Sequence, residues 1–75
     1  MFEKEKFVER LNSLMKQNKL SKQALADAIG VSRAAASQFA HGANLPSIPT
    51  LVTIADYFNV SLDYLVGRSD EPERQ

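Results

Sequence analysis

The 75-residue sequence predicts a single all-α domain built from five short helices. Apolar residues recur at steps of three and four along most of the chain, which is the spacing of one helix face. A serine that can accept a hydrogen bond from a free backbone N–H precedes four of these stretches. Glycine or asparagine stands where they end, because these residues enter the left-handed conformation most readily. The serines are Ser21, Ser32, Ser47 and Ser61, and the terminating residues are Gly30, Gly42, Asn59 and Gly67.

The first helix is expected from Glu3 to Asn18. Its apolar side chains fall on one stripe, which would face the core. Glutamates near its start and lysines near its end suit the helix dipole. The stripe consists of Phe7, Val8, Leu11, Leu14 and Met15.

Two helices joined by a tight turn are expected between Ser21 and Gly42. The spacing predicts helices over Lys22–Ile29 and Arg33–His41, and a turn of about three residues between them is typical of a helix-turn-helix. Ala26 supplies the small side chain needed where the second helix crosses the first. The inward residues are Leu25, Ala26 and Ile29, then Ala36, Phe39 and Ala40.

A fourth helix is expected from the Ser47 cap to Asn59, with Pro49 tolerated in its first turn. Its expected core residues are Leu51, Val52, Ile54, Ala55 and Phe58. A fifth helix, Leu62–Val66, is too short to be stable alone and must be held by packing. We expect residues 1–67 to form the domain and residues 68–75 to form a flexible charged tail or the start of a linker.

Composition excludes several classes of protein. The chain has no cysteine, so it has neither a disulfide framework nor a thiolate metal site. His41 is its single histidine, so no metal centre, catalytic triad or cofactor is expected, and the protein is not expected to be an enzyme. No apolar run approaches the roughly 20 residues of a membrane span, and the N-terminus lacks a signal-peptide core. A cytoplasmic protein is the simplest expectation.

Charge is distributed unevenly along a chain whose net charge is zero. Residues 10–45 have a net charge of +4, whereas residues 46–75 have a net charge of −3. The basic side chains of the first segment are Arg10, Lys16, Lys19, Lys22 and Arg33, against Asp27 alone. Such asymmetry can orient a protein on a polyanion, although the alternative is a set of merely solvated surface charges.

An ordered set of residues runs through nearly the whole chain. Its first part is Leu20, Ser21, Leu25, Ala26, Ile29, Gly30, Val31, Ser32, Phe39 and Gly42. Its second part is Pro46, Ser47, Leu51, Ile54, Ala55, Phe58, Asn59, Val60, Ser61, Leu62, Tyr64 and Leu65. With this set the sequence resembles the lambda-repressor-like helix-turn-helix of phage repressors, Cro proteins and Xre-type regulators. The resemblance implies a five-helix DNA-binding fold with a central helix-turn-helix.

The same resemblance implies that Arg33–His41 is the helix that reads DNA bases. Arg33 can donate a bidentate pair to guanine, and Gln38 can do the same for adenine. Ala34 offers only a methyl contact, for instance to thymine, and Ser37 can reach a base or a phosphate. The expected base contacts are therefore Arg33, Ala34, Ser37 and Gln38.

Backbone phosphates are expected to meet a wider set of residues. Lys22 and Gln23 stand where relatives often have a phosphate-binding Gln, at a helix N-terminus that favours anions. Asn44 lies in a loop that lacks the basic residues relatives often place there. The expected phosphate contacts are Lys19, Lys22, Gln23, Ser32, His41 and Asn44.

Met15 and Ala40 stand where relatives commonly have an Arg–Glu ion pair. Replacing both charged partners with apolar residues can be neutral, whereas removing one would strand a charge. We therefore expect Met15 and Ala40 to lie close together.

A homodimer on a near-palindromic operator is the assembly that the resemblance implies. The expected dimer interface is Leu62, Tyr64, Leu65 and Val66, and the alternative is that these four residues belong to the core. The expected function is a transcriptional regulator of the phage-repressor type in the nucleoid of a bacterial or phage-infected cell. Other possible partners are polymerase, a toxin or an antirepressor. The rival hypothesis is an antitoxin or another protein-interaction module on the same fold.

Overall fold

The computed structural model describes residues 3–73, and these form five helices. The helices are α1 (Lys4–Gln17), α2 (Lys22–Ile29), α3 (Arg33–His41), α4 (Ile48–Phe58) and α5 (Leu62–Leu65). The predicted bounds of α2 and α3 are confirmed. Helix α1 is two residues shorter than expected, and α5 is one residue shorter.

Local capping sets where four of the helices begin. The hydroxyl oxygens of Ser21, Ser32, Ser47 and Ser61 each accept a hydrogen bond from the backbone N–H three residues later. Gly30, Gly42 and Asn59 follow the helices with positive φ angles, as predicted. The sequence signals for these helix ends are therefore confirmed at the level of individual hydrogen bonds.

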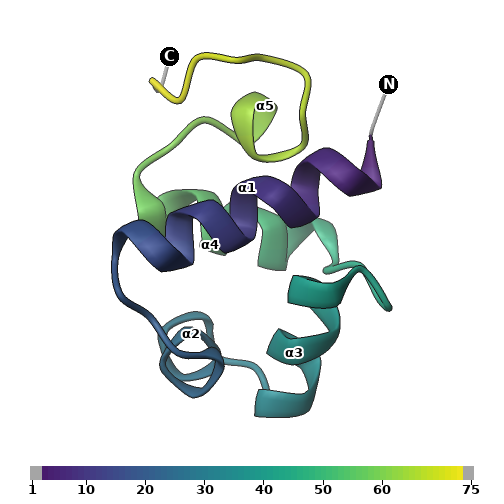
Figure 1. The fold of residues 1–75 in the computed structure, drawn as a ribbon, viewed down its shortest axis with the longest axis vertical. Coiled ribbons are helices and arrows are strands. Elements are labelled where there is room, and N and C mark those ends of the chain that lie inside the picture. The colour runs from purple at the N-terminus through teal and green to yellow at the C-terminus, as the bar shows by residue number, and fades with distance from the viewer. Residues whose placement is uncertain (1–2, 74–75) are drawn as a thin grey trace.

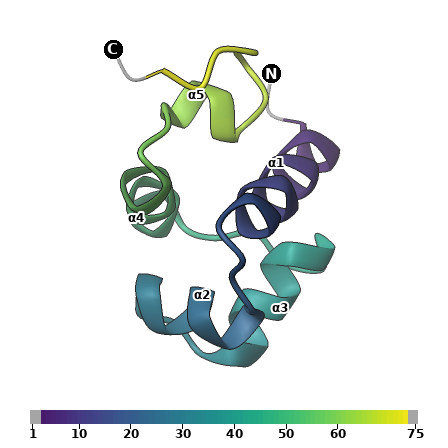
Figure 2. The same ribbon diagram turned by 60° about the vertical axis from the view of Figure 1, so that its left-hand side comes forward.

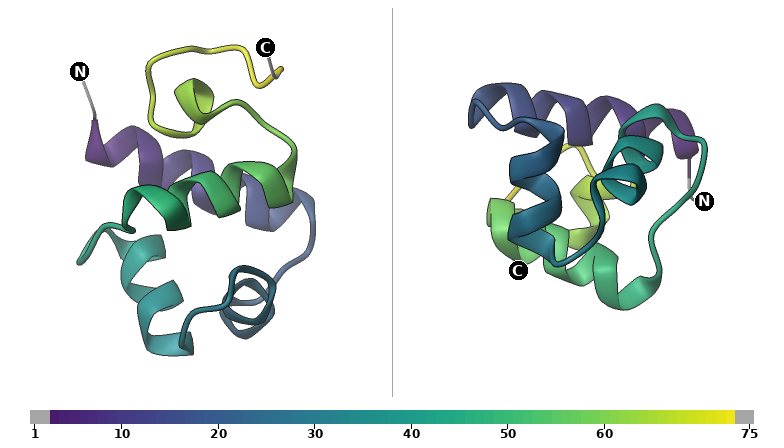
Figure 3. Two further views of the ribbon diagram at one scale, coloured as in Figure 1. Left: turned by 180° about the vertical axis from the view of Figure 1, so that it is seen from behind. Right: turned by 90° about the horizontal axis from the view of Figure 1, so that it is seen from below.

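The five helices are arranged on three levels. Helices α1 and α4 lie at the middle level on opposite sides of the molecule, α2 and α3 lie on one side of this level, and α5 lies on the other (Figures 1 and 2). The views from behind and from below agree with this arrangement (Figure 3). The C-terminal segment lies at the α5 end, so the helix-turn-helix end is free of it.

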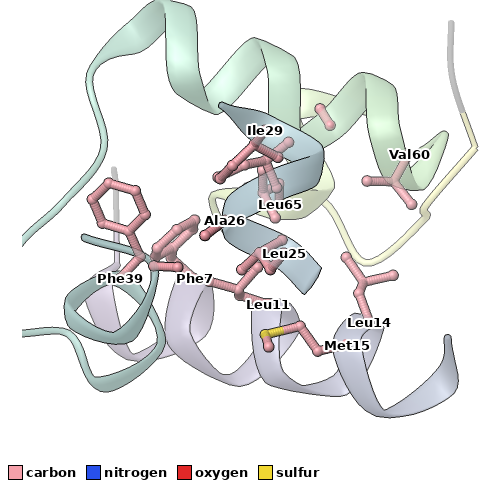
Figure 4. Close-up of a cluster of buried hydrophobic side chains, with 13 residues drawn as sticks. Phe7, Leu11, Leu14, Met15, Leu25, Ala26, Ile29, Phe39, Val60 and Leu65 are labelled. Carbon is pink, nitrogen blue, oxygen red and sulfur yellow. The ribbon is translucent and has the colours of Figure 1, made fainter. Parts of the chain in front are cut away.

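The core draws on every helix (Figure 4). Phe7, Leu11, Leu25, Ile54 and Leu65 are completely buried. Ala26 is also inaccessible to solvent, as expected for an inward residue of α2, and its role at the crossing of α2 and α3 stays a prediction. One expectation for α4 is wrong: Val52 is 42% exposed, because it stands on the side of α4 that turns away from the buried cluster.

Residues 67–72 return to pack against α1 and α5. The carbonyl oxygen of Pro72 accepts a hydrogen bond from the Ser61 N–H, at 2.9 Å. Gly67 approaches α1 so closely that an added Cβ would lie 2.8 Å from the Cβ of Lys6. This segment is thus hydrogen-bonded to the domain, and the boundary expected after residue 67 stays a prediction.

The guanidinium of Arg10 holds this returning segment. It donates to the carbonyl oxygens of Tyr64 (2.6 Å) and Ser69, and to the carboxylate of Asp70 (2.8 Å). It also lies over the Tyr64 ring, 4.2 Å from the ring centroid. Arg10 therefore belongs to the α5 end of the molecule, not to the basic group expected around the helix-turn-helix.

Candidate nucleic-acid interface

The N-terminus of α2 presents Lys22 and Gln23 in its first turn. Ser21 uses its hydroxyl to accept from the Ala24 N–H at 3.1 Å, which fixes this end of the helix. The amide of Gln23 donates to the Asp27 carboxylate at 2.9 Å, so that amide is engaged within α2. Lys22 forms no ion pair with any residue between 3 and 73. Its charge and the positive end of the helix are available to an anion.

Helix α3 is anchored by one face and exposes the other. Ser32 caps it through the Ala35 N–H at 3.1 Å, and its buried residues are Ala36, Phe39 and Ala40. The opposite face carries all four residues predicted to read bases. Arg33, Ala34 and Gln38 are exposed and Ser37 is half-buried. Their exposure is what direct contact with base edges requires.

The two helices form an open hollow between them. It has a volume of about 410 Å³ and is lined by Lys22, Arg33, Ala34 and Ser37. Three predicted base-reading residues and one predicted phosphate-binding residue therefore meet in one place. Two cations and a hydroxyl around an open hollow are suited to a phosphate oxygen or a polar base edge.

The C-terminal part of α3 is linked to the loop that follows it. The Asn44 amide lies 3.5 Å from the Gln38 side-chain oxygen, and the Asn44 oxygen accepts from the Leu45 N–H. Ser37 Oγ lies 3.4 Å from Nδ1 of His41. These contacts bring the predicted phosphate residues Asn44 and His41 beside predicted base-reading residues. Lys19 is exposed at the corner between α1 and α2, with a φ of +56°.

The predicted dimer residues lie at the opposite end of the molecule. Leu65 is completely buried inside the chain, so its assignment to a dimer interface is wrong and it belongs to the core. The ring of Tyr64 is covered by Arg10. Leu62 is 38% exposed and Val66 is half-buried, so only part of the expected surface faces outward.

Asn12 connects α1 to α3, a role that the sequence did not lead us to expect. Its side-chain amide donates to the Ala40 carbonyl oxygen at 2.9 Å. An asparagine in the middle of a helix is a signal that points to such use, because its helix propensity is poor. Met15 lies in the core cluster, whereas Ala40 is buried outside it, so the expected contact between these two side chains stays a prediction.

Between residues 3 and 73, no group of three His, Asp or Glu side chains is arranged to hold a metal ion. None of the helices in that range has the length and apolar character needed to cross a bilayer.

Comparison with known families identifies the architecture. A family model described as Helix-turn-helix matches residues 11–65. The chain belongs to this family. This match confirms the family that was expected from the ordered residues. Members of the family of the Xre type are DNA-binding transcriptional regulators rather than enzymes.

Two curated members of the family are similar over most of this chain. The uncharacterized HTH-type transcriptional regulator YqaE of Bacillus subtilis (strain 168) is 41% identical over 66 residues, which are 87% of this chain and 57% of YqaE. The phage CTXphi transcriptional repressor RstR of Vibrio cholerae is 36% identical over 70 residues, which are 93% of this chain and 62% of RstR. The chain thus spans about three fifths of the curated relatives that it matches.

Solved structures have the same fold. The P22 c2 repressor, in complex with a synthetic operator, superposes with a TM-score of 0.78 and 28% identity. That match covers 84% of this chain and 96% of the repressor chain. LexA from Eubacterium rectale, named as an SOS-response transcriptional repressor, gives a TM-score of 0.80 at 30% identity, over 84% of this chain and 67% of the LexA chain. These matches confirm the lambda-repressor-like fold.

Proposed function

We propose that this protein is a sequence-specific transcriptional regulator that binds a near-palindromic operator as a dimer. The observation that carries the proposal is the hollow between α2 and α3. One side is lined by the exposed N-terminal residues of α3 and the other by the unpaired Lys22. Such a pairing of a reading helix with a phosphate-binding helix is the docking arrangement of helix-turn-helix proteins.

Each side chain has a distinct role in this proposal. The first residues of α3 enter the major groove, where Arg33 donates to the O6 and N7 atoms of guanine and Gln38 pairs with adenine. Ala34 contacts a thymine methyl group. Lys22 and the free N–H groups of α2 bind a backbone phosphate and hold α3 in register. Asn44 and His41 extend the phosphate contacts along the C-terminal end of α3.

The size of the described domain supports a dimeric arrangement. Successive major grooves on one face of B-DNA are about 34 Å apart. The longest principal extent of the chain is 28 Å, and it carries one reading helix. One copy therefore reads a half-site, and two copies related by a two-fold axis read both halves. The P22 c2 repressor, solved in complex with a synthetic operator, and the transcriptional repressor RstR support operator binding by similarity.

Transcription would be controlled through occupancy of the operator. A dimer bound over a promoter blocks polymerase, and one bound beside it can contact polymerase.

Selection from a randomised duplex pool tests the proposal. Wild-type protein and the Arg33→Ala variant are selected in parallel at moderate salt. We expect the wild type to enrich a two-fold motif with guanine at a fixed half-site position, and the variant to lose that guanine. Failure of the wild type to enrich any motif would contradict the proposal and favour a protein partner instead.

A further inference from the structure

Three of the last four carbonyl groups of α3 accept hydrogen bonds from three different donors. The final four carbonyls of any helix lack partners within the helix. Here the Ala43 N–H donates to Gln38 O at 3.0 Å, and the Gly42 N–H donates to Phe39 O at 3.3 Å. The next carbonyl, that of Ala40, accepts its bond from Asn12 on α1. The C-terminus of α3 is thus capped in part by a side chain of α1.

Both amide hydrogens of Asn12 have a partner. One interaction goes to Ala40 O at 2.9 Å and the other to Val8 O, one turn back on α1, at 2.8 Å. A side-chain amide carries two N–H donors, so this one is fully used. The bond to Val8 holds the side chain on the surface of α1, and the bond to Ala40 attaches α3 to it.

Close packing at Gly42 marks the same point of attachment. A Cβ added there would lie 3.1 Å from Val8 Cγ2 and 3.6 Å from Lys4 Cε. The end of α3 therefore lies directly against α1, and an extra carbon there would be in tight contact with Val8. The hydrogen bond and the packing are separate observations, and both place the attachment of α3 to α1, its anchor on that helix, at the C-terminus of α3.

Arg33, at the start of α3, is far from this anchor, so the angle between α3 and α1 decides where the Arg33 side chain lies. With a rise of about 1.5 Å per residue, Arg33 stands about 10 Å from Ala40 along the helix. A tilt of about 6° at the anchor would therefore move the start of α3 by about 1 Å. Hydrogen bonds to base edges tolerate only a few tenths of an ångström, so such a tilt would break them.

We propose that Asn12 is a positioning residue for DNA recognition. It sets the angle of α3 against α1 and so aims Arg33 and Gln38 at their bases, without touching DNA itself. This inference rests on the proposed function, because it assigns Asn12 a part in the same reading helix.

Asn18 offers a matched control for Asn12. Its side-chain amide donates to Leu14 O at 2.8 Å, the same bond to the preceding turn of α1, and no hydrogen bond joins it to α3. Asn12→Ala and Asn18→Ala therefore both lose the bond to α1, and only Asn12→Ala loses the bond to α3. Asn12→Asp is a third variant, which keeps the shape but puts an acceptor against the Ala40 carbonyl.

The first readout compares affinity for the selected operator with affinity for a random duplex in the same salt. It is made at a temperature at which circular dichroism reports every variant fully folded. Asn12→Ala should bind the operator about fivefold more weakly and the random duplex as the wild type does. Asn12→Asp should lose more, and Asn18→Ala should match the wild type. If the ratio of operator affinity to random-duplex affinity is the same in Asn12→Ala as in the wild type, the proposal is overturned and Asn12 has a role in stability alone.

The second readout needs no DNA. Residual dipolar couplings of backbone N–H groups give the angle between α1 and α3 in solution. This angle should change by several degrees in Asn12→Ala and stay constant in Asn18→Ala; an unchanged angle in Asn12→Ala would also overturn the proposal. If the wild type binds no duplex at all, the proposed function fails, and the couplings still decide whether Asn12 positions α3.

Discussion

Arg10 and Arg33 stand at opposite ends of the molecule and are used in opposite ways. The Arg10 side chain is only 11% exposed and is surrounded by two carbonyl oxygens, a carboxylate and an aromatic ring. Arg33 is exposed at the first position of α3 and forms no ion pair with residues 3–73. What the fold places beside an arginine therefore decides whether it stabilises the protein or remains available to a ligand.

The same contrast extends to the two ends as a whole. At the α5 end, Lys6 and Arg10 face Asp70, so positive charge is compensated. At the helix-turn-helix end, Lys22 and Arg33 surround an open hollow. A protein of zero net charge thus keeps uncompensated positive charge where a polyanion would bind.

The largest effects are expected where the two ends share one core. Leu25 of α2 and Leu65 of α5 are both completely buried. Leu25→Ala and Leu65→Ala should each lower the free energy of unfolding by about 2–5 kcal/mol, through lost burial and the cavity left behind. Urea unfolding followed by circular dichroism measures the loss.

Tyrosine fluorescence tests whether the two ends unfold independently, because Tyr57 lies in α4 and Tyr64 lies in α5, outside the helix-turn-helix. In Leu25→Ala, fluorescence and circular dichroism should report one midpoint. Two separate midpoints would mean that the helix-turn-helix end unfolds by itself.

Smaller losses of stability are expected from substitutions at two glycines, one at each end of the molecule. Gly67 has a φ of +87° and a close neighbour in Lys6, whereas Gly30 has a φ of +76° and open space around it. Gly30→Ala should destabilise the protein by about 1 kcal/mol, from the left-handed backbone alone. Gly67→Ala should cost about 2–3 kcal/mol, because its Cβ must also displace Lys6. Thermal unfolding of both variants provides the measurement, and equal losses would mean that residues 67–72 do not pack on α1.

The salt dependence of DNA affinity in Lys22→Ala tests whether the helix-turn-helix end, and not the α5 end, contacts phosphate. Loss of one phosphate contact should reduce the slope of log affinity against log salt by about 1 and weaken binding to all duplexes alike. Lys6→Ala, at the other end, is the matched control and should leave the slope unchanged. Anisotropy titrations at several salt concentrations measure both slopes. An unchanged slope in Lys22→Ala would remove Lys22 from the interface.

Helix ends were predictable because their signals are local. Each capping serine bonds a backbone N–H only three residues away, so a short window of sequence contains both the signal and its partner. The family residues added the order of the helices and the exposed face of α3. Together these gave the fold and the four residues expected to read bases.

Contacts between distant segments were not predictable in this way. Arg10 meets Ser69 and Asp70 across about sixty positions, and no periodicity reports such a partner. Apolar spacing identified the faces of α4 and α5 but not how far the core extends around them. For that reason Val52 was expected inside, whereas it is 42% exposed. Leu65 was expected at a dimer surface because of the family resemblance, and the packing of the other helices buries it completely.

The most direct test exchanges the two arginines for methionine and measures two quantities on each variant. The free energy of unfolding comes from urea titration, and operator affinity comes from fluorescence anisotropy. Arg10→Met should lose about 2 kcal/mol of stability, because it strips donors from two carbonyl oxygens, and should keep its affinity. Arg33→Met should lose about 10- to 100-fold in operator affinity and stay within about 0.5 kcal/mol of wild-type stability. Wild-type affinity in Arg33→Met, or an equal loss of affinity in fully folded Arg10→Met, would contradict the assignment of DNA reading to the α2–α3 end.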